Sequence, residues 1–225
     1  MTPWELLDTT AVPDGGGELR LCRRGDEYSI SVGHLELMNS RVHGSEEALA
    51  ELTCQRLEGR AGLRVLVGGL GMGFTLAAAL KHLGADAEVL VAELVPAVVA
   101  WNRDVLSQLA GCPLKDSRVT VHEGDVGELI RSEKGAFDAI LLDVDNGPEG
   151  FSRKENDCLY SAPGLSAVRA ALRPKGVFGV WSISPDQRFS KRLKQSGLIA
   201  EEMVVRARAG KKGGRHTIWL ATKRL

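Results

Sequence analysis

The chain has 225 residues, of which 44% are hydrophobic and 26% are charged. This size and composition suit one compact domain with a small appendage, and they exclude a disordered tail. Lys plus Arg and Asp plus Glu number 29 each, so no overall field attracts the chain to nucleic acid or anionic lipid. The four cysteines lie far apart, and no Cys/His group has metal-ligand spacing. We therefore expect reduced thiols and no metal site.

The first 44 residues predict a small N-terminal β element. An arm ends in the turn "PDGGG", and the runs "ELRLCRR", "EYSISVG" and "HLELMN" follow with the partial alternation typical of strands. The arm has no basic stretch followed by an apolar core, and no run in the chain reaches the roughly 18 apolar residues of a membrane span. We expect a cytoplasmic protein that does not enter membranes.

A larger α/β domain is expected over residues 45–225. It opens with "SEEALAELTCQRLEG", a predicted helix with Ser45 as its N-cap and Gly59 beyond its end. From Leu63 onward strands and helices alternate, which indicates a largely parallel sheet covered on both faces. The predicted strands are "LRVLVG", "AEVLVAEL", "RVTVHEG", "FDAILLDV", "GVFGVWS", "EEMVVRAR" and "HTIWLAT".

Five helices are predicted between these strands. They begin near Gly73, span 96–109 with Pro96 at the first helical position, follow Val126, and span about 161–172 and 185–196. The last two strands, joined by "AGKKGGR", read as an antiparallel hairpin at the sheet edge. The whole predicts a Rossmann-like sheet of seven strands with the last strand antiparallel.

Ligands of open α/β sheets bind beyond the carboxyl ends of the strands. The residues at those positions are Gly69, Gly71, Met72 and Gly73 after the first strand, Glu93 after the second, Asp125 after the third, and Asp143, Asp145 and Asn146 after the fourth. The glycines allow a close approach of backbone to ligand, although packing of strand against helix explains them as well. Glu93 suits the two hydroxyls of a ribose. Asp125 suits an adenine amino group, or it only caps the next helix.

Phosphate-binding motifs do not fit this turn. The third glycine of a G-x-G-x-x-G fingerprint is missing, and no Gly-Lys-Ser/Thr follows. A nucleoside without a pyrophosphate is the ligand that the pattern favours.

This arrangement resembles the class I S-adenosylmethionine-dependent transferases. More closely, residues 63–179 resemble the spermidine synthase family in "VLVGGLGMG", "VAELVPAVVAWNR", "DSRVTVHEGD", "FDAILLDVDNGPEG" and "LYSAPGLSAVRAALRPKGVF". The resemblance implies the class I fold behind a small N-terminal β element, a donor that is S-adenosylmethionine or its decarboxylated form, and a homodimer. It also implies that Asp143 is the catalytic acid.

Three departures from the family pattern concern the donor tail and the acceptor. Met72 stands where the family has an Asp that holds the amine of the aminopropyl group, and a thioether cannot replace that acceptor. The second acid of the D-S-S-D-P pattern falls on Asn146, with Asp145 one residue earlier. A tyrosine-histidine pair is replaced by "NSRVHGSEE", in which His43 and Glu46 form a candidate acceptor wall or only a helix start.

The function predicted from these residues is methyl transfer from S-adenosylmethionine to a nitrogen of a small amine or heterocycle. Asp143 and Asp145 would orient the acceptor and take its proton, although Asp145 also suits turn chemistry. Aminopropyl transfer is one alternative, and a catalytically silent nucleoside-binding relative is another. No nucleic-acid acceptor is expected, because "DNGPEGF" lacks the Asn/Asp-Pro-Pro-aromatic motif and the basic run 206–216 has no interleaved aromatic residue.

Overall fold

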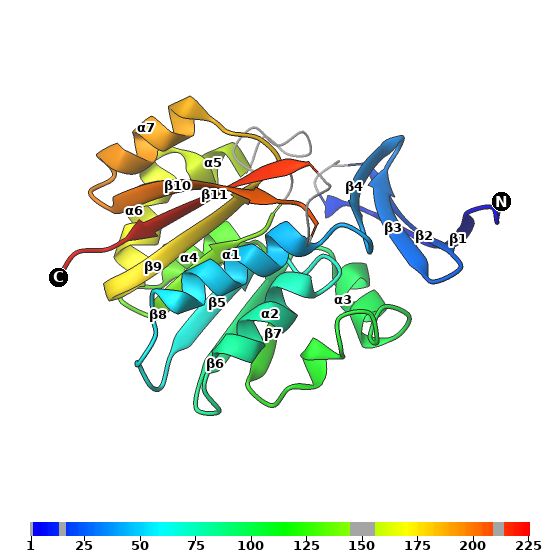
Figure 1. The fold of residues 1–225 in the computed structure, drawn as a ribbon, viewed down its shortest axis with the longest axis horizontal. Helices are drawn as coiled ribbons and strands as arrows, with labels where there is room; N and C mark the ends of the chain where they lie inside the picture. Colours follow the sequence, from blue (N-terminus) through cyan, green and yellow to red (C-terminus); the bar gives the residue numbers. More distant parts are fainter. Residues whose placement is uncertain (1, 14–16, 145–155, 209–213) are drawn as a thin grey trace.

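The computed structural model describes residues 2–13, 17–144, 156–208 and 214–225. Within these ranges the chain forms a four-stranded and a seven-stranded sheet. In Figure 1 the small sheet lies at one end of the molecule, beside α3 and the start of α1, and the two termini lie at opposite ends. No helix in the described ranges is long and apolar enough to cross a bilayer.

The large sheet has the predicted seven strands. They are β5 (Arg64–Gly68), β6 (Glu88–Glu93), β7 (Val119–Glu123), β8 (Phe137–Leu142), β9 (Leu172–Ser182), β10 (Ile199–Arg206) and β11 (Arg215–Thr222). Their order is β10-β11-β9-β8-β5-β6-β7, and β11 runs antiparallel to both neighbours. The strand order reverses between β5 and β8, so the crevice for a ligand lies where these two strands end.

Helices cover both faces of this sheet, which explains why all six residues of β8 are buried. One face carries α1 (Gly44–Gln55), α2 (Phe74–His82) and α3 (Pro96–Arg103), and the other carries α4 (Val126–Ser132), α5 (Asn156–Tyr160), α6 (Ala162–Ala171) and α7 (Gln187–Gln195). A 3-10 turn, η2, spans Pro113–Lys115. The two faces form separate hydrophobic clusters, and the one beneath α1 and α2 also includes residues of the small sheet.

The small sheet is antiparallel in the order β1-β2-β3-β4. Its strands are β1 (Glu5–Ala11), β2 (Glu18–Arg24), β3 (Glu27–Val32) and β4 (Leu35–Asn39). The last three confirm the prediction, but the first was expected to be an arm. Residues of β1 are mostly exposed, so "ELLDTTA" lacks the alternation of apolar and polar residues that marks a strand. It is a strand because its backbone pairs with that of β2.

Two helix boundaries differ from the prediction. Helix α1 begins at Gly44, with His43 at the N-cap, so Ser45 lies inside the first turn and is not the cap. The Ser45 hydroxyl instead contacts Glu46 and His216. Helix α3 ends at Arg103 because Asp104 leaves helical geometry, whereas the sequence predicted continuation to 109. Pro96 does begin α3 as predicted.

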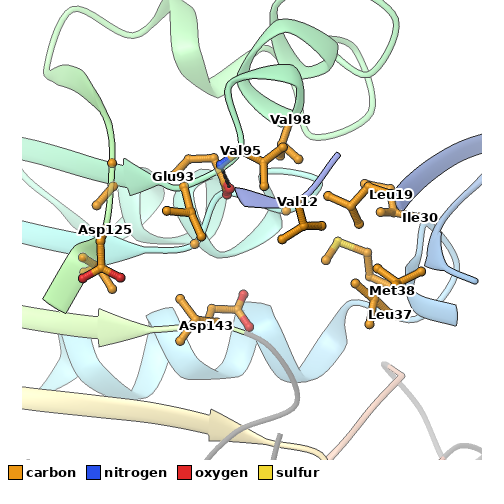
Figure 2. Close-up of a pocket in the computed structure, with 18 residues that line it drawn as sticks. Val12, Leu19, Ile30, Leu37, Met38, Glu93, Val95, Val98, Asp125 and Asp143 are labelled. Carbon is orange, nitrogen blue, oxygen red and sulfur yellow. Dashed lines mark hydrogen bonds between the residues drawn. The ribbon is translucent and has the colours of Figure 1, made fainter. Parts of the chain in front are cut away.

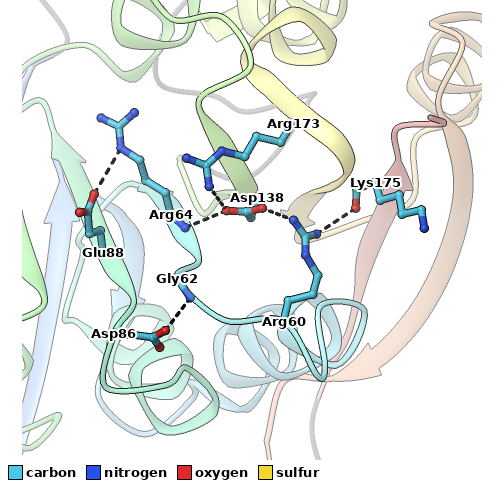
Figure 3. Close-up of polar contacts among 8 residues, drawn as sticks. All are labelled: Arg60, Gly62, Arg64, Asp86, Glu88, Asp138, Arg173 and Lys175. Carbon is cyan, nitrogen blue, oxygen red and sulfur yellow. Dashed lines mark hydrogen bonds and ion pairs between the residues drawn. The ribbon is translucent and has the colours of Figure 1, made fainter.

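An ionic cluster around the buried side chain of Asp138 lies at the amino end of β8 (Figure 3). The side chain of Asp138 is only 3% exposed, and it pairs with Arg60 and, at 2.6 Å, with Arg173. The same carboxylate accepts the backbone N–H of Arg64 at 2.9 Å. Both oxygens of Asp138 therefore have charged or polar partners, as a buried carboxylate requires.

Candidate functional site

A cleft opens where β5 to β8 end, and its space, including the part open to solvent, is about 870 Å³. In Figure 2, Glu93 and Asp143 lie on opposite sides of the cleft, with Asp125 toward one end and Met38 toward the other. The apolar wall near Met38 comes from the N-terminal region and includes Val12, Leu19, Ile30, Val32 and Leu37. The cleft is therefore formed on one side by the strand ends of the large sheet and on the other by residues of the N-terminal region.

The glycine turn adopts left-handed backbone at Gly69, Gly71 and Gly73, with φ of 86°, 52° and 84°. A Cβ on Gly69 would lie 2.3 Å from the carbonyl oxygen of Asp143. Packing of the β5 and β8 ends therefore already requires a glycine at this position, whether or not a ligand binds. Gly69 and Gly71 line the cleft, whereas Gly73 caps α2 beside Asn102 and does not line it.

Glu93 lies at the end of β6 and is 8% exposed. Its Oε2 accepts the backbone N–H of Leu70 and its Oε1 accepts that of Val95, both at 2.9 Å. Burial raises the pKa of Glu93, and these backbone donors oppose the rise. Glu93 also lines the cleft, so hydroxyl groups of a ligand there can join these backbone donors at the carboxylate oxygens.

Asp125 is the N-cap of α4, where its Oδ1 accepts the backbone N–H of Glu128 at 2.8 Å. It also lines the cleft. Capping uses one oxygen of the carboxylate, so the helix role and a contact with a ligand are compatible.

A second chamber of about 600 Å³ adjoins the cleft and shares Leu37, Met38, Gly71 and Asp143 with it. Its other lining residues are Asn39, Glu46, Leu70, Met72, Phe74 and Trp181. Two carboxyl groups face a space walled mainly by apolar and aromatic side chains. Such a space suits a small cation with an aliphatic body.

Asp143 lies between the two spaces and is partly buried. Its Oδ2 accepts the hydroxyl of Thr75 in the first turns of α2. Burial raises the pKa of Asp143 to about 6, and the Thr75 bond opposes the rise. No Lys or Arg within the described ranges forms an ion pair with Asp143, so a bound cation would relieve its desolvation.

Glu46 projects from the first turn of α1 into the second chamber. Burial, and then the neighbouring charge of Asp143, raise the pKa of Glu46 to about 7. The Ser45 hydroxyl donates to Glu46 Oε2 at 2.6 Å. Two partly buried carboxyl groups that repel one another are thus held beside one space, a pattern typical of functional sites.

Not all of the predicted site residues meet at this place. The ring of His43 stacks on Phe74 with centroids 4.1 Å apart and lies 3.2 Å from Glu47, so it supports a chamber wall without lining the chamber. Met72 lines the chamber and is 3% exposed within the core. Asp145 and Asn146 lie outside the described residues.

Other lining residues were not predicted from the sequence. Trp181 stands at the end of β9, where the rule that ligands bind beyond strand ends would have found it. Thr75 and Phe74 follow the glycine turn directly. Leu37 and Met38 belong to β4 of the small sheet and line the cleft. No local sequence pattern predicts that the small sheet packs there. Among the described residues, no group of three or more His, Cys, Asp or Glu side chains is arranged to hold a metal ion.

Comparison with known families gives this site a context. The family model of the spermine/spermidine synthase domain matches residues 44–191, well over half of the chain. The chain belongs to this family. The match includes both carboxylates of the second chamber and excludes the small N-terminal sheet.

A curated relative, the polyamine aminopropyltransferase of Leptospira biflexa, is 34% identical over 113 residues, which cover 50% of this chain and 38% of that protein. The chain therefore aligns with well under half the length of this relative. Spermidine synthase from Thermotoga maritima has the same fold, with a TM-score of 0.78 and 18% identity over 97% of this chain and 72% of that one.

A putative O-methyltransferase from Klebsiella pneumoniae is a more distant structural neighbour. Its TM-score is 0.55, at 23% identity over 81% of this chain and 80% of that one. The fold is therefore shared by this family and by methyltransferases, as the sequence predicted, and fold alone does not separate the two reactions.

Proposed function

We propose that this protein transfers an aminopropyl group from decarboxylated S-adenosylmethionine to a small amine. Membership of the spermine/spermidine synthase family and the relative named polyamine aminopropyltransferase support this reaction over the methyl transfer favoured by the sequence alone. Substitution at Met72 suggested methyl transfer because it removes an acid from the glycine turn. Glu46, from a different element, places another acid in the same chamber.

The observation that carries the proposal is the pair of partly buried carboxyl groups, Glu46 and Asp143, beside the cleft. An amine in water is mostly an ammonium ion at neutral pH. Such a cation relieves the repulsion that raises the pKa of Glu46 and binds between the carboxylates. The same groups can then take a proton from the amine, since their pKa values lie near neutrality.

The donor's nucleoside would occupy the cleft. In this assignment the carboxylate of Glu93 accepts the ribose hydroxyls, Asp125 faces the adenine amino group, and the backbone at Gly69 and Gly71 borders the ligand. The positions of Glu93 and Asp125 on the cleft wall support this assignment. Gly73 has a structural role here, since it caps α2.

The reaction is a displacement at the carbon beside the sulfonium. The neutral amine forms a C–N bond while the C–S bond breaks, and its electron pair stays on sulfur to give methylthioadenosine. The proton that the new ammonium loses goes to a carboxylate of the pair. The protein's contribution is alignment and deprotonation of the acceptor, for which Asp143, at the junction of the two spaces, is well placed.

Methyl transfer remains the second candidate because Met72 offers no acceptor for the ammonium of an aminopropyl tail. S-adenosylmethionine has a carboxylate on that tail, which backbone N–H groups of a glycine turn can bind. The acceptor's site would be the same. A homodimer, expected from the family resemblance, remains a prediction that light scattering of the purified protein can check.

The proposal is tested by calorimetry with S-adenosylmethionine, its decarboxylated form and methylthioadenosine, followed by mass spectrometry of a diamine incubated with each donor. We expect tighter binding of the decarboxylated donor and a product extended by propylamine. A methylated product would establish the second candidate. Binding without any product from a panel of diamines would indicate a silent relative. Glu93→Gln is the matched control, because it keeps the side-chain shape and weakens all three ligands.

A further inference from the structure

A hydrogen-bonded chain leads from the second chamber toward the surface. Ser45 Oγ lies 2.6 Å from Glu46 Oε2 and 2.8 Å from His216 Nδ1. Ser45 is completely buried in the first turn of α1, and His216 is a partly buried residue of β11. The two residues are 171 positions apart in sequence, so the large sheet and α1 bring them together only in the folded chain.

The single proton of the Ser45 hydroxyl couples the states of its two neighbours. When Glu46 is ionised, Ser45 donates to Glu46 and His216 must donate from Nδ1. When Glu46 is protonated, it can donate to Ser45, and Ser45 then donates to an unprotonated Nδ1. The ring nitrogen that carries the histidine proton is therefore set by the charge of Glu46.

The other end of the histidine ring lies beside Gly214. Gly214 is exposed, and a Cβ built on it would lie 3.8 Å from His216 Nε2. Trp181 packs edge-on against the ring, with centroids 4.9 Å apart, and fixes its orientation. Partial burial lowers the pKa of His216, which favours release of a proton that it receives.

Within the described residues, the charged groups that act on Glu46 come from α1 and from the residue after β8. Asp143 and Glu47 act on Glu46, and His43 lies beside Glu47. Asp143 has its own partner, Thr75, and no described side chain other than Ser45 connects Glu46 to the surface by hydrogen bonds. A proton accepted by Glu46 thus has one bonded exit within the described residues.

We propose that Ser45 and His216 carry away the proton that the acceptor amine loses. This inference rests on the proposed function. Glu46 takes the proton and passes one from Oε2 to Ser45 Oγ, while Ser45 passes its own proton to His216 Nδ1. His216 then releases the proton on Nε2 to water, and the carboxylate of Glu46 is restored. Before the next turnover the Ser45–His216 bond opens, and the ring exchanges its Nδ1 proton for one on Nε2 through water. Both residues are positioning residues, since they act through Glu46.

A purely structural role is the competing explanation, in which the same bonds only tie β11 to α1. His216→Asn separates the two explanations. An asparagine amide can take the place of Nδ1 as hydrogen-bond partner of Ser45, but it cannot pass a proton. His82→Asn, at an exposed residue in the last turn of α2, is the matched control.

The first test needs no activity. In full-length protein labelled in histidine nitrogens and glutamate carboxyls, NMR titration should show Glu46 and the His216 nitrogens changing through a common midpoint. In Ser45→Ala, which removes only one oxygen, the two groups should titrate separately. Identical titrations of His216 in parent and Ser45→Ala would overturn the relay. A coupled titration in a protein that transfers no aminopropyl group would refute the proposed function and leave the relay standing.

The second test is kinetic. We expect His216→Asn to lower turnover roughly 10-fold, less than the roughly 10²-fold effect of a directly positioned base, with the donor KM unchanged. Imidazole added to the buffer should restore the rate, because it accepts the proton in place of the ring. If His216→Asn turned over as fast as the parent and His82→Asn, the relay would be refuted. The bond between Ser45 and His216 would then only hold β11 to α1.

Discussion

One aspartate lies at each end of strand β8, Asp138 inside the strand and Asp143 just beyond it, and the two differ in their partners. Asp138, near the amino end, has two arginines and a backbone N–H as partners (Figure 3). Asp143, drawn in Figure 2, lies just beyond the carboxyl end, and its side chain accepts the hydroxyl of Thr75 and pairs with no cation within the described residues. The protein itself thus neutralises the charge of Asp138. The charge of Asp143 is available to a cationic ligand.

The difference teaches where to look for function in this fold. Burial of a carboxylate is costly in either place. At the amino end of the sheet the chain offsets the cost itself, and the result is stability. At the carboxyl end the cost persists as a raised pKa of Asp143, and a cation that reaches the site can lower it. Strained electrostatics of this kind cluster at functional sites.

The largest effect is expected at the amino end. Asp138→Ala should lower the free energy of unfolding by about 3 kcal/mol, the lower end for breaking a buried ion pair, because the arginines left behind are partly exposed. Urea denaturation measures this loss. Asp86→Ala is the matched control, since exposed Asp86 accepts only the N–H of Gly62 and should change stability by less than about 1 kcal/mol. If both variants lost the same free energy of unfolding, the ion pairs of Asp138 would contribute no special stability.

At the carboxyl end the loss should appear in turnover. Asp143→Asn keeps the side-chain volume and an acceptor for Thr75, but it removes the charge that orients and deprotonates the amine. We expect a rate lowered by roughly 10²-fold with unchanged donor affinity. The measurement is steady-state kinetics with decarboxylated S-adenosylmethionine and a diamine. A variant as active as the parent would exclude Asp143 from the mechanism.

Stability should respond to Asp143 in the opposite direction. Its folded pKa, about 6, lies above the unfolded value, so ionisation of Asp143 opposes folding. The free energy of unfolding should fall as pH rises from about 4 to about 6 and then level off. Asp143→Asn should therefore be more stable than the parent at pH 7 by about 2 kcal/mol, a value reduced from 1.4 kcal/mol per pKa unit because Glu46 shares the environment. Parallel pH curves of parent and variant would contradict this sign.

The smallest effect concerns the donor. Glu93→Gln keeps one oxygen for a backbone N–H but loses the charge that strengthens bonds to ribose hydroxyls. We expect affinity for methylthioadenosine to fall about 10-fold, equivalent to about 1.4 kcal/mol, while the thermal transition stays within a few degrees. Calorimetry measures the affinity. Unchanged affinity would mean that Glu93 only braces the glycine turn.

Much of the fold could be predicted from the sequence, because periodicity reports strands and helices directly. The seven strands and the antiparallel hairpin of β10 and β11 follow from apolar runs and turns. Strand β1 could not be found, since its side chains are mostly exposed. The boundary at Ser45 was wrong because its hydroxyl binds His216, a partner 171 residues away, and local capping rules do not include such partners.

The site was predictable where it follows strand ends and unpredictable where distant segments meet. Glu93, Asp125 and Asp143 line the cleft as the strand-end rule indicates. The preference for methyl transfer came from three departures from the family pattern, at Met72, at Asp145 and Asn146, and in "NSRVHGSEE". The sequence does not show that Glu46 enters the chamber of Met72 from α1. Gly69 illustrates the reverse case: the close approach that demands a glycine is made by the carbonyl of Asp143, a contact between neighbouring strands.

The central claim is that Glu46 and Asp143 form a site for an amine cation. Carboxyl-carbon NMR of the labelled protein, titrated with and without a diamine, tests it most directly. We expect Asp143 to titrate near pH 6 and Glu46 near pH 7 in the free protein, and both midpoints to move downward when the diamine binds, because a cation favours the ionised forms. Midpoints at ordinary carboxyl values, or midpoints that the diamine leaves unchanged, would contradict the claim.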